Sequence, residues 1–470
     1  MISRLGLAIS RIFRATAPDP FVIAIALTLF TALLAVLCGT AYHDLAVSDR
    51  LIAILDVWRF NDAVPAGDRL GIWKLLEFTM QMCLVLVTGS ALACAPPIRV
   101  LIRSAASLPK STASAAAMIG FVACACALVN WGLGLIVGAH LAREVGRSMK
   151  SRGIPCHYPL LCAAGYTGLM VWHGGLSGSA PLSMTTAAGA AKVLPAEYAQ
   201  QLGEQGVPLS HTLFSPMNIV ISLGLLVLTP VLLAMLAPRK TEQVQLPPDD
   251  LDLFQTSTSE SARTLPDRLD RSPIVVWILA IALALGLTRF ARSSGWERIG
   301  LNEVNAAMLA LGLVMHGSPI QYMRAAEEGA RGCAGIIIQF PLYAGIMAMM
   351  QGSGLVQSIA QSMTQHSSAH SLPVLTFLSA GVINLFIPSG GGQWAVQGPL
   401  ALTSGLQLGV EPGKMIMSVA YGDQLTNMLQ PFWALPLLAI TGVKARDIVG
   451  YTAVVMVVCG AWIALGLWMF

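Results

Sequence analysis

Long apolar stretches separated by short polar segments dominate the pattern of this chain. A helix needs about 20 mostly apolar residues to cross the hydrocarbon core of a membrane. By that criterion the pattern predicts nine membrane spans, at residues 21–40, 72–95, 158–190, 210–237, 273–290, 302–316, 331–351, 414–442 and 447–469. The chain is therefore predicted to be an all-α polytopic membrane protein.

Two of these spans are too long to be simple helices. Residues 158–190 and 414–442 carry Gly, Pro, Ser, Thr and Asn in mid-segment. Such residues predict helices that break at membrane depth, where the freed backbone must face protein or a wet cavity.

Two further apolar stretches, 112–150 and 371–409, each have a polar, Gly-rich middle, Asn130–Gly134 and Pro388–Trp394. Either stretch could form two spans. We interpret each as a re-entrant hairpin, because most Lys- and Arg-rich loops then fall on the cytoplasmic side, as the positive-inside rule requires. One short outer loop, with Arg292 and Arg298, goes against this rule.

The chain divides near its middle at a polar segment rich in Gln, Ser, Thr, Pro and Asp. We predict a first repeat at 1–240, a cytoplasmic linker at 241–272, and an extra span plus a second repeat at 273–470. An odd number of crossings separates the equivalent spans, so the second repeat is inverted.

The two halves carry similar landmarks. Asn130 precedes Tyr166 by almost the same distance as Asn384 precedes Tyr421. Inverted repeats with discontinuous helices are typical of secondary transporters, whose substrate sites lie near the membrane midplane where the breaks meet.

Composition agrees with a membrane protein. Hydrophobic residues make up 55% of the chain, charged residues only 11%, and the mean hydropathy is +0.68. A soluble domain carries roughly 25% charged residues, so this chain could not cover a folded surface in water. The net charge of +4 is spread thinly, which disfavours nucleic-acid binding. The first apolar run begins only after Pro20, too late for a removable signal peptide, so we expect an anchor helix and a cytoplasmic N-terminus.

Asp423 is the only carboxylate well inside a predicted span. An ionised Asp at the bilayer centre costs about 3 kcal/mol even on lenient scales. It is either a structural cap of the broken helix or a cation or proton site, with Gln424, Thr426 and Asn427 supplying neutral oxygens. A Na⁺ site would then use Asp423, Thr426 and Asn427.

His173 lies in the first broken segment. Counting back from the glycines that end the two broken segments places His173 and Gly174 opposite Thr426 and Asn427. This imidazole is either an interhelical strut or, because it titrates near neutral pH, a proton carrier or substrate contact. His140 is expected to be only a surface group.

The segment Ser389–Gln393 is either a tight turn or an anion-binding nest. Consecutive backbone N–H groups beside a helix N-terminus suit one carboxylate. No Lys or Arg lies deep in a predicted span, which favours a monocarboxylate with a short apolar tail over a dicarboxylate or a phosphate. Aromatic residues near enough in sequence to cover that tail are Trp172, Trp394, Phe432 and Trp433.

Four segments resemble the bacterial short-chain fatty acid transporter family of the AtoE type: Asn130–Ile136, Val171–Pro181, Phe386–Pro399 and Tyr421–Pro431. The run Pro388-Ser-Gly-Gly-Gly-Gln-Trp394 is the most specific part. The resemblance implies uptake of acetoacetate and butyrate, and places the chain in the ion transporter superfamily. It also implies an inverted-repeat, elevator-type fold with two hairpins, and a homodimer.

The leading hypothesis is therefore an ion-coupled secondary transporter of short-chain monocarboxylates in the bacterial cytoplasmic (inner) membrane, in contact with lipid. It has no cofactor beyond a coupling ion, H⁺ or Na⁺. Alternatives are a dicarboxylate or other organic anion carrier and, from another class, an intramembrane enzyme. The candidate substrate- and ion-binding residues are Asn130, Gly132, His173, Gly174, Ser177, Ser179, Ser389, Gly390, Gly391, Gln393, Asp423, Gln424, Thr426 and Asn427.

Overall fold

A computed structural model describes residues 19–59, 71–185, 206–238, 264–294, 301–364, 367–388 and 390–470. Every regular element within these ranges is a helix. The all-α prediction is therefore confirmed for the described part of the chain.

The α-helices of the first half are α2 (Pro20–Cys38), α3 (Val47–Arg59), α4 (Leu76–Cys94), α5 (Pro96–Ser107), α6 (Thr112–Val129), α7 (Trp131–Ser151), α8 (Tyr158–Tyr166), α9 (Ser179–Ser183) and α12 (Pro216–Leu236). Those of the second half are α13 (Leu265–Asp270), α14 (Pro273–Ser294), α15 (Leu301–His316), α16 (Pro319–Ala330), α17 (Ala334–Gly352), α18 (Leu355–Thr364), α19 (Leu372–Asn384), α20 (Gly390–Gln407), α21 (Pro412–Thr426), α22 (Pro431–Thr441) and α23 (Ala445–Met469). Short 3₁₀ helices are η1 (Thr167–Met170), η2 (Trp172–Gly174), η3 (Leu209–His211), η6 (Arg331–Cys333) and η7 (Asn427–Leu429).

Among the described residues, six helical segments are long and apolar enough to cross a membrane. They are Phe21–Cys38, Thr112–Val129, Pro216–Leu236, Pro273–Ser293, Pro319–Gly352 and Ala445–Met469. Thr79–Cys94 and Pro96–Ser107 are bent by 79° and would add a seventh span if they count as one. The chain is thus a multi-pass membrane protein. The nine spans stay a prediction, because several of them are broken or too short to form one continuous spanning helix.

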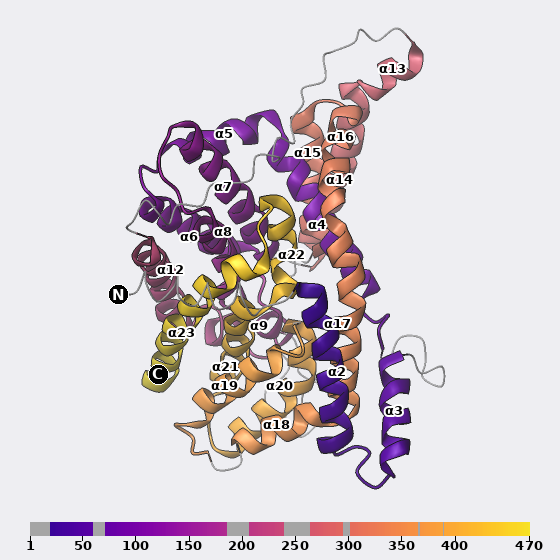
Figure 1. The fold of residues 1–470 in the computed structure, drawn as a ribbon, viewed down its shortest axis with the longest axis vertical. Helices are drawn as coiled ribbons and strands as arrows, with labels where there is room; N and C mark the ends of the chain where they lie inside the picture. Colours follow the sequence, from indigo (N-terminus) through magenta and orange to yellow (C-terminus); the bar gives the residue numbers. More distant parts are fainter. Residues whose placement is uncertain are drawn as a thin grey trace.

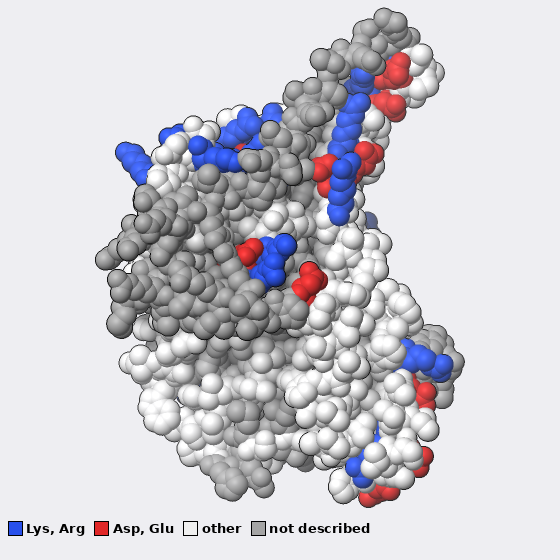
Figure 2. All heavy atoms as spheres, viewed as in Figure 1, with Lys and Arg blue, Asp and Glu red and all other residues white. Residues whose placement is uncertain are grey.

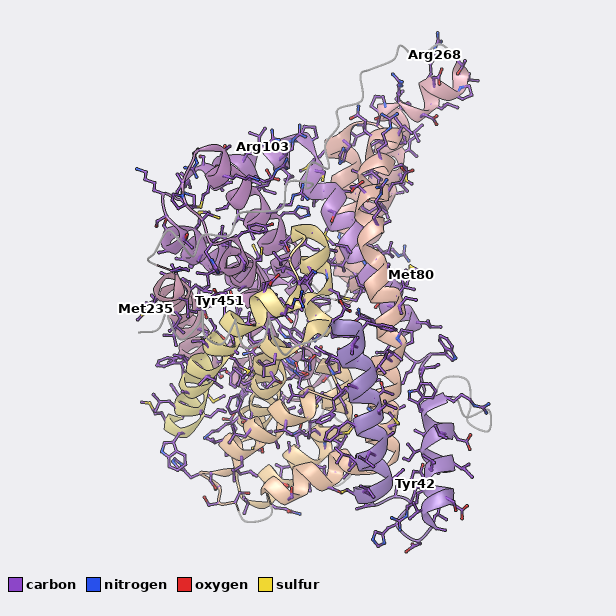
Figure 3. All side chains as sticks on the ribbon, viewed as in Figure 1. Tyr42, Met80, Arg103, Met235, Arg268 and Tyr451 are labelled. Atoms are coloured by element: carbon purple, nitrogen blue, oxygen red, sulfur yellow. The ribbon has the colours of Figure 1, made fainter. Side chains whose placement is uncertain are left out.

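Large apolar side chains on the outer surface fit this assignment. Met80 on α4 is 58% exposed and Met235 on α12 is 49% exposed, and both lie at the edge of the molecule, whereas Tyr451 is fully buried (Figure 3). On the face in Figure 2, charged side chains gather at the upper end, in a small group near the middle and beside α3, and the surface over α18 to α20 is uncharged. Apolar surface of this extent favours lipid as the solvent.

The two segments predicted to be broken helices, 158–190 and 414–442, leave α-helical geometry within their described residues. The first runs from α8 through η1 and η2 to α9, and the second from α21 through η7 to α22. Gly175 belongs to the first break, where a Cβ would lie 2.3 Å from the carbonyl oxygen of Leu128. The next amide, of Leu176, donates to that same carbonyl at 2.7 Å. Glycine thus allows the break to dock on the end of α6.

One order of elements occurs twice along the chain. A pair of helices joined by a short turn (α4–α5, α17–α18) is followed by two helices that meet at a break (α6–α7, α19–α20). A helix ending in 3₁₀ turns (α8, α21) and, further on, a long apolar helix (α12, α23) complete each copy. Figure 1 shows α9, α21 and α22 in the middle of the molecule, where α9 packs on α20 and α21 and α22 packs on α7.

Helices α7 and α8 cross at a close backbone contact. A Cβ on Gly138 would lie 2.2 Å from the carbonyl oxygen of Gly165, and one on Gly165 would lie 2.5 Å from that of Gly138. We expect Gly138→Leu to lower the free energy of unfolding by about 3 kcal/mol, because overpacking forces the backbones apart. Thermal unfolding in detergent measures this. Gly286→Leu on α14, where a Cβ meets open space, is the control and should change little.

Candidate functional site

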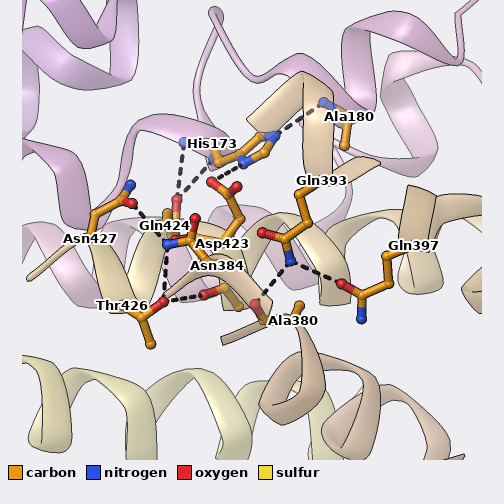
Figure 4. A network of polar contacts seen from close by, with 12 residues as sticks. His173, Ala180, Ala380, Asn384, Gln393, Gln397, Asp423, Gln424, Thr426 and Asn427 are labelled. Atoms are coloured by element: carbon orange, nitrogen blue, oxygen red, sulfur yellow. Dashed lines mark hydrogen bonds and ion pairs between the residues drawn. The ribbon is translucent and has the colours of Figure 1, made fainter. Parts of the chain in front are cut away.

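A buried His–Asp pair joins the two interrupted segments. His173 lies in η2 and Asp423 in α21, and they are 0% and 2% exposed. The imidazole Nδ1 lies 3.1 Å from the carboxylate Oδ1 (Figure 4). A carboxylate removed from water is costly unless donors or positive charge stabilise it. His173 supplies one of the partners that the burial of Asp423 requires.

The other ring nitrogen of His173 is also occupied. The backbone N–H of Ala180, in α9, donates to Nε2 at 3.1 Å. Because Nε2 accepts this bond, the proton of the neutral ring belongs on Nδ1, which donates to Asp423. A second proton on Nε2 would place two N–H groups against each other. These bonds therefore hold a neutral imidazole that orients the carboxylate.

Gln424 connects α21 to the backbone of the first break. Its Oε1 accepts from the amides of His173 at 3.0 Å and Gly174 at 3.3 Å. On the opposite side, Asn218 Nδ2 donates to the carbonyl of Gly174 at 2.9 Å, and its Oδ1 accepts from the Tyr421 hydroxyl at 2.8 Å. Side chains thus satisfy backbone groups that the interrupted helix leaves free.

The predicted pairing of the two breaks is one turn out of register. His173 and Gly174 bond to Asp423 and Gln424, not to Thr426 and Asn427. The sequence count aligned both segments on their terminal glycines. The two breaks differ in length, with two 3₁₀ helices in the first and one in the second, so the count shifts the contact.

Asn384, at the end of α19, holds the second break together. Its Nδ2 donates to the carbonyl of Asp423 at 2.7 Å, to Thr426 Oγ1 at 3.0 Å and to Asn427 Oδ1 at 2.9 Å (Figure 4). Asn384 was absent from the predicted site. The signal that could have found it was its correspondence with Asn130, which the sequence had already suggested.

Gln393 and Gln397 continue the network along α20. Gln393 Nε2 donates to the carbonyl of Ala380 and to Gln397 Oε1, both at 2.9 Å. Gln397 Nε2 donates to Ser379 Oγ at 3.0 Å. Both glutamine side chains are buried. Gln397 was also missed, although it lies four residues after Gln393 and therefore on the same face of α20.

Asn130 and Ser177 make structural hydrogen bonds at the point where α6 meets α7. Asn130 is the N-cap of α7, and its Oδ1 accepts from the amides of Gly132 at 2.9 Å and Leu133 at 3.2 Å. Ser177 Oγ accepts from the Trp131 amide at 3.1 Å, which ties the segment before α9 to this cap. Ser179 begins α9.

Replacing the cap should therefore act on stability. Asn130→Ala is expected to lower the free energy of unfolding by about 1 kcal/mol, the usual cost of a lost N-cap. Asn130→Asp, which keeps a capping oxygen, should retain most of it. Thermal unfolding in detergent checks both variants. An unchanged stability in Asn130→Ala, with a large loss of substrate affinity, would contradict a capping role.

The glycine-rich segment forms the start of α20. Gly390 is buried, and a Cβ there would lie 2.7 Å from Trp172 Cη2 and 2.9 Å from His173 Cε1. Gly391 is exposed, and a Cβ there would meet open space. Ser389 lies outside the described residues. Amides in the first turn of an 18-residue helix are suited to an anion.

The aromatic residues predicted to cover a substrate tail are all buried. Trp172 stacks on His173 with ring centroids 4.2 Å apart. Trp131, which was not among the predicted aromatic residues, lies edge-on to Trp172 at 6.4 Å and to Trp433 at 5.1 Å. Phe432 lies edge-on to Trp433 at 5.1 Å. These rings form a continuous apolar cluster beside the His–Asp pair.

The prediction that His140 is a surface group is wrong. His140 and Arg143 lie in α7, and only 4% and 1% of their surfaces are exposed. Helix α7 continues to Ser151 and packs against α5, α6, α8 and α22. Arg143 Nε lies 3.6 Å from Glu144 Oε1.

Comparison with known proteins identifies the chain. A sequence model described as "Short chain fatty acid transporter" matches residues 1–470. The chain belongs to the short-chain fatty acid transporter family. Two curated members of this family carry the name "Putative short-chain fatty acid transporter" and align over 100% of both chains. One is from Escherichia coli (strain K12), at 37% identity over 476 residues, and the other from Haemophilus influenzae, at 35% over 472 residues.

Solved structures are more distant from this family member. A YdaH transporter from Alcanivorax borkumensis has a TM-score of 0.45 at 16% identity, with 96% of this chain and 97% of that chain covered. MtrF from Neisseria gonorrhoeae has a TM-score of 0.34 at 14% identity, with 97% of each covered. Neither likeness is close enough to support a conclusion. Family membership indicates a transporter rather than an enzyme.

Proposed function

We propose that this protein is a secondary active transporter that takes up short-chain monocarboxylates such as acetoacetate and butyrate. Transport is driven by a H⁺ or Na⁺ gradient across the bacterial cytoplasmic membrane, with the N-terminus in the cytoplasm. One observation carries this proposal. Among the described residues, the hydrogen-bonded network at the two breaks contains one carboxylate, Asp423, and no Lys or Arg (Figure 4). Such a site suits a single small anion together with one cation.

The substrate carboxylate is proposed to bind the first amides of α20, at Gly390 and Gly391. The absence of a side chain at Gly391 leaves room for close approach, and the open space beside it supports this placement. The ring of Trp172 lies against Gly390, and its buried indole N–H has no hydrogen-bond partner, so it can supply a further donor. The cluster of Trp131, Trp172 and Trp433 then covers the alkyl tail.

Movement of the site is proposed to follow an elevator scheme in a homodimer. The repeated order of elements supports two inverted repeats, 1–240 and 273–470, joined by the linker at 241–272. The hairpins are 112–150 and 371–409, and the broken helices are 158–190 and 414–442. A carrier that moves its site through lipid must keep the net charge of that site low, because each buried charge is costly. A bound cation beside Asp423 meets this need.

A carrier of dicarboxylates is the nearest alternative. A second substrate carboxylate would need a second cationic or strongly donating partner, and competition uptake with succinate distinguishes the two classes. An intramembrane enzyme would need a free nucleophile, but Ser177 Oγ accepts the Trp131 amide in a structural contact. Recovery of chemically unchanged substrate after uptake would exclude such an enzyme.

Uptake of labelled butyrate and acetoacetate into proteoliposomes tests the proposal. Na⁺ and H⁺ gradients are imposed separately, with the membrane potential clamped. We expect saturable accumulation under one of the two gradients. Accumulation that tracks succinate in preference to butyrate, or uptake that never saturates, would overturn the monocarboxylate assignment.

A further inference from the structure

We infer that Asp423, Asn384 and Gln393 form a binding site for one Na⁺ ion. The inference rests on the proposed function, since it names the coupling ion of that site. Three buried oxygens carry it: Asp423 Oδ2, Asn384 Oδ1 and Gln393 Oε1 have no hydrogen-bond partner. The three residues are at most 2% exposed.

The identity of these atoms as oxygens is fixed by their partners. Asn384 Nδ2 donates to the backbone carbonyl of Asp423, and Gln393 Nε2 donates to the backbone carbonyl of Ala380. A carbonyl only accepts, so neither amide can be turned over without losing a bond. His173 occupies Asp423 Oδ1, which leaves Oδ2 open. All three free atoms are therefore acceptors.

The contacts bring these acceptors to one place. Asn384 is bonded to the backbone of Asp423, and Ala380, which holds Gln393, lies one turn before Asn384 in α19. Gly390, one turn before Gln393 in α20, lies against His173, the partner of Asp423. Figure 4 shows the carbonyl end of Gln393 turned towards Asp423 and Asn384.

Buried acceptors without donors are unfavourable, and three neighbouring oxygens also repel one another. A cation satisfies all three at once. One carboxylate with two amide oxygens matches a monovalent hard cation, because Ca²⁺ sites take six to eight oxygens, usually with several carboxylates, and Mg²⁺ retains water. Among the described residues no group of three or more His, Cys, Asp and Glu could hold a transition metal.

A proton is the main competitor. His173 cannot take it without losing the bond from Ala180. A proton on Asp423 Oδ2 could be donated to only one of the two amide oxygens, and the other would stay unpaired. Thr426 and Asn427, the ligands first considered for Na⁺, have their side-chain oxygens engaged by Asn384. The sodium site thus shares only Asp423 with that set.

The test measures cation binding without substrate. Thermal unfolding of the full chain in detergent is followed against NaCl, with choline chloride keeping the ionic strength constant, and KCl and a pH series are run in parallel. A ligand that binds only the folded state raises Tm as its concentration exceeds Kd. We expect a saturable rise with Na⁺ that K⁺ does not reproduce.

Variants then assign the site. Gln393→Leu and Asp423→Asn should each weaken Na⁺ affinity at least tenfold. Gln339→Leu is the matched control, because this glutamine is also buried but lies in α17, outside the network of Figure 4. Its Na⁺ affinity should equal that of the wild type. If a variant fails to fold, ²³Na NMR line broadening of the wild type with and without added Li⁺ provides a second measure.

A wild-type Tm that is insensitive to Na⁺ but depends on pH would overturn the sodium site in favour of protonated Asp423. Equal losses in Gln393→Leu and Gln339→Leu would also overturn it, as a general effect on folding. The proposed function fails separately. Na⁺ binding without butyrate uptake contradicts the substrate assignment and leaves the sodium site intact. H⁺-driven butyrate uptake without Na⁺ binding supports the substrate assignment and contradicts the sodium site.

Discussion

Gly391→Val is expected to reduce butyrate uptake at least 100-fold while leaving folding and membrane insertion almost unchanged. The branched side chain would fill the open space beside the first turn of α20, where we place the substrate carboxylate. A carboxylate held by charge-assisted bonds to backbone amides gains about 1.5–3 kcal/mol from each bond. Loss of two such bonds therefore accounts for the expected effect.

The local geometry makes this variant a clean test of substrate binding. A Cβ on Gly391 would have no neighbour within 4 Å, and the residue does not have a positive φ, so valine there meets neither a clash nor a strained backbone. Gly391→Ala should show a smaller loss, and Gly286→Val on α14 should show none. Radiolabelled butyrate binding and uptake are measured together with Tm. Wild-type affinity in Gly391→Val would refute the amide site.

The sequence predicted where the helices break because the cause is local. Glycine, proline and side chains that compete with backbone bonds fix the ends of α8, α21 and α22, so the interruptions could be read directly. The polar middle at Asn130 was likewise visible, since an N-cap acts within one turn. Asp423 and His173 were found because a titratable group in an apolar run requires an explanation.

What depends on tertiary packing could not be predicted. His140 lies in an apolar and basic stretch, and only the packing of α5, α8 and α22 around α7 decides that it is buried. The pairing of His173 with Asp423 rather than Asn427 depends on the lengths of two irregular segments. Asn384 and Gln397 face the site because of the rotation of α19 and α20 about their axes, which is set by their packing against other helices.

Asp423→Asn is expected to remove gradient-driven accumulation almost completely, by about 100-fold, while substrate binding at saturating cation falls less than tenfold. The carboxylate is the one charged oxygen of the network, and its replacement by a neutral amide removes the attraction that a coupling cation needs. Loss of a charged partner in a buried site costs about 2–3 kcal/mol, which matches this factor. Accumulation is compared with counterflow exchange, which requires binding but no coupling.

His173 separates the two possible coupling ions. His173→Gln keeps a side-chain donor for Asp423, and His173→Leu removes it. If the imidazole only orients Asp423, His173→Gln should retain about a tenth or more of the uptake rate, with the wild-type dependence on pH between about 6 and 8, where the substrate stays ionised. His173→Leu should resemble Asp423→Asn, because the carboxylate would lose the Nδ1–H donor that holds it.

The Ala180 amide on Nε2 is the reason to expect no flattening of the pH profile. A flat profile in His173→Gln would mean that the ring carries a proton during transport, and unchanged gradient dependence in Asp423→Asn would remove the carboxylate from the coupling mechanism.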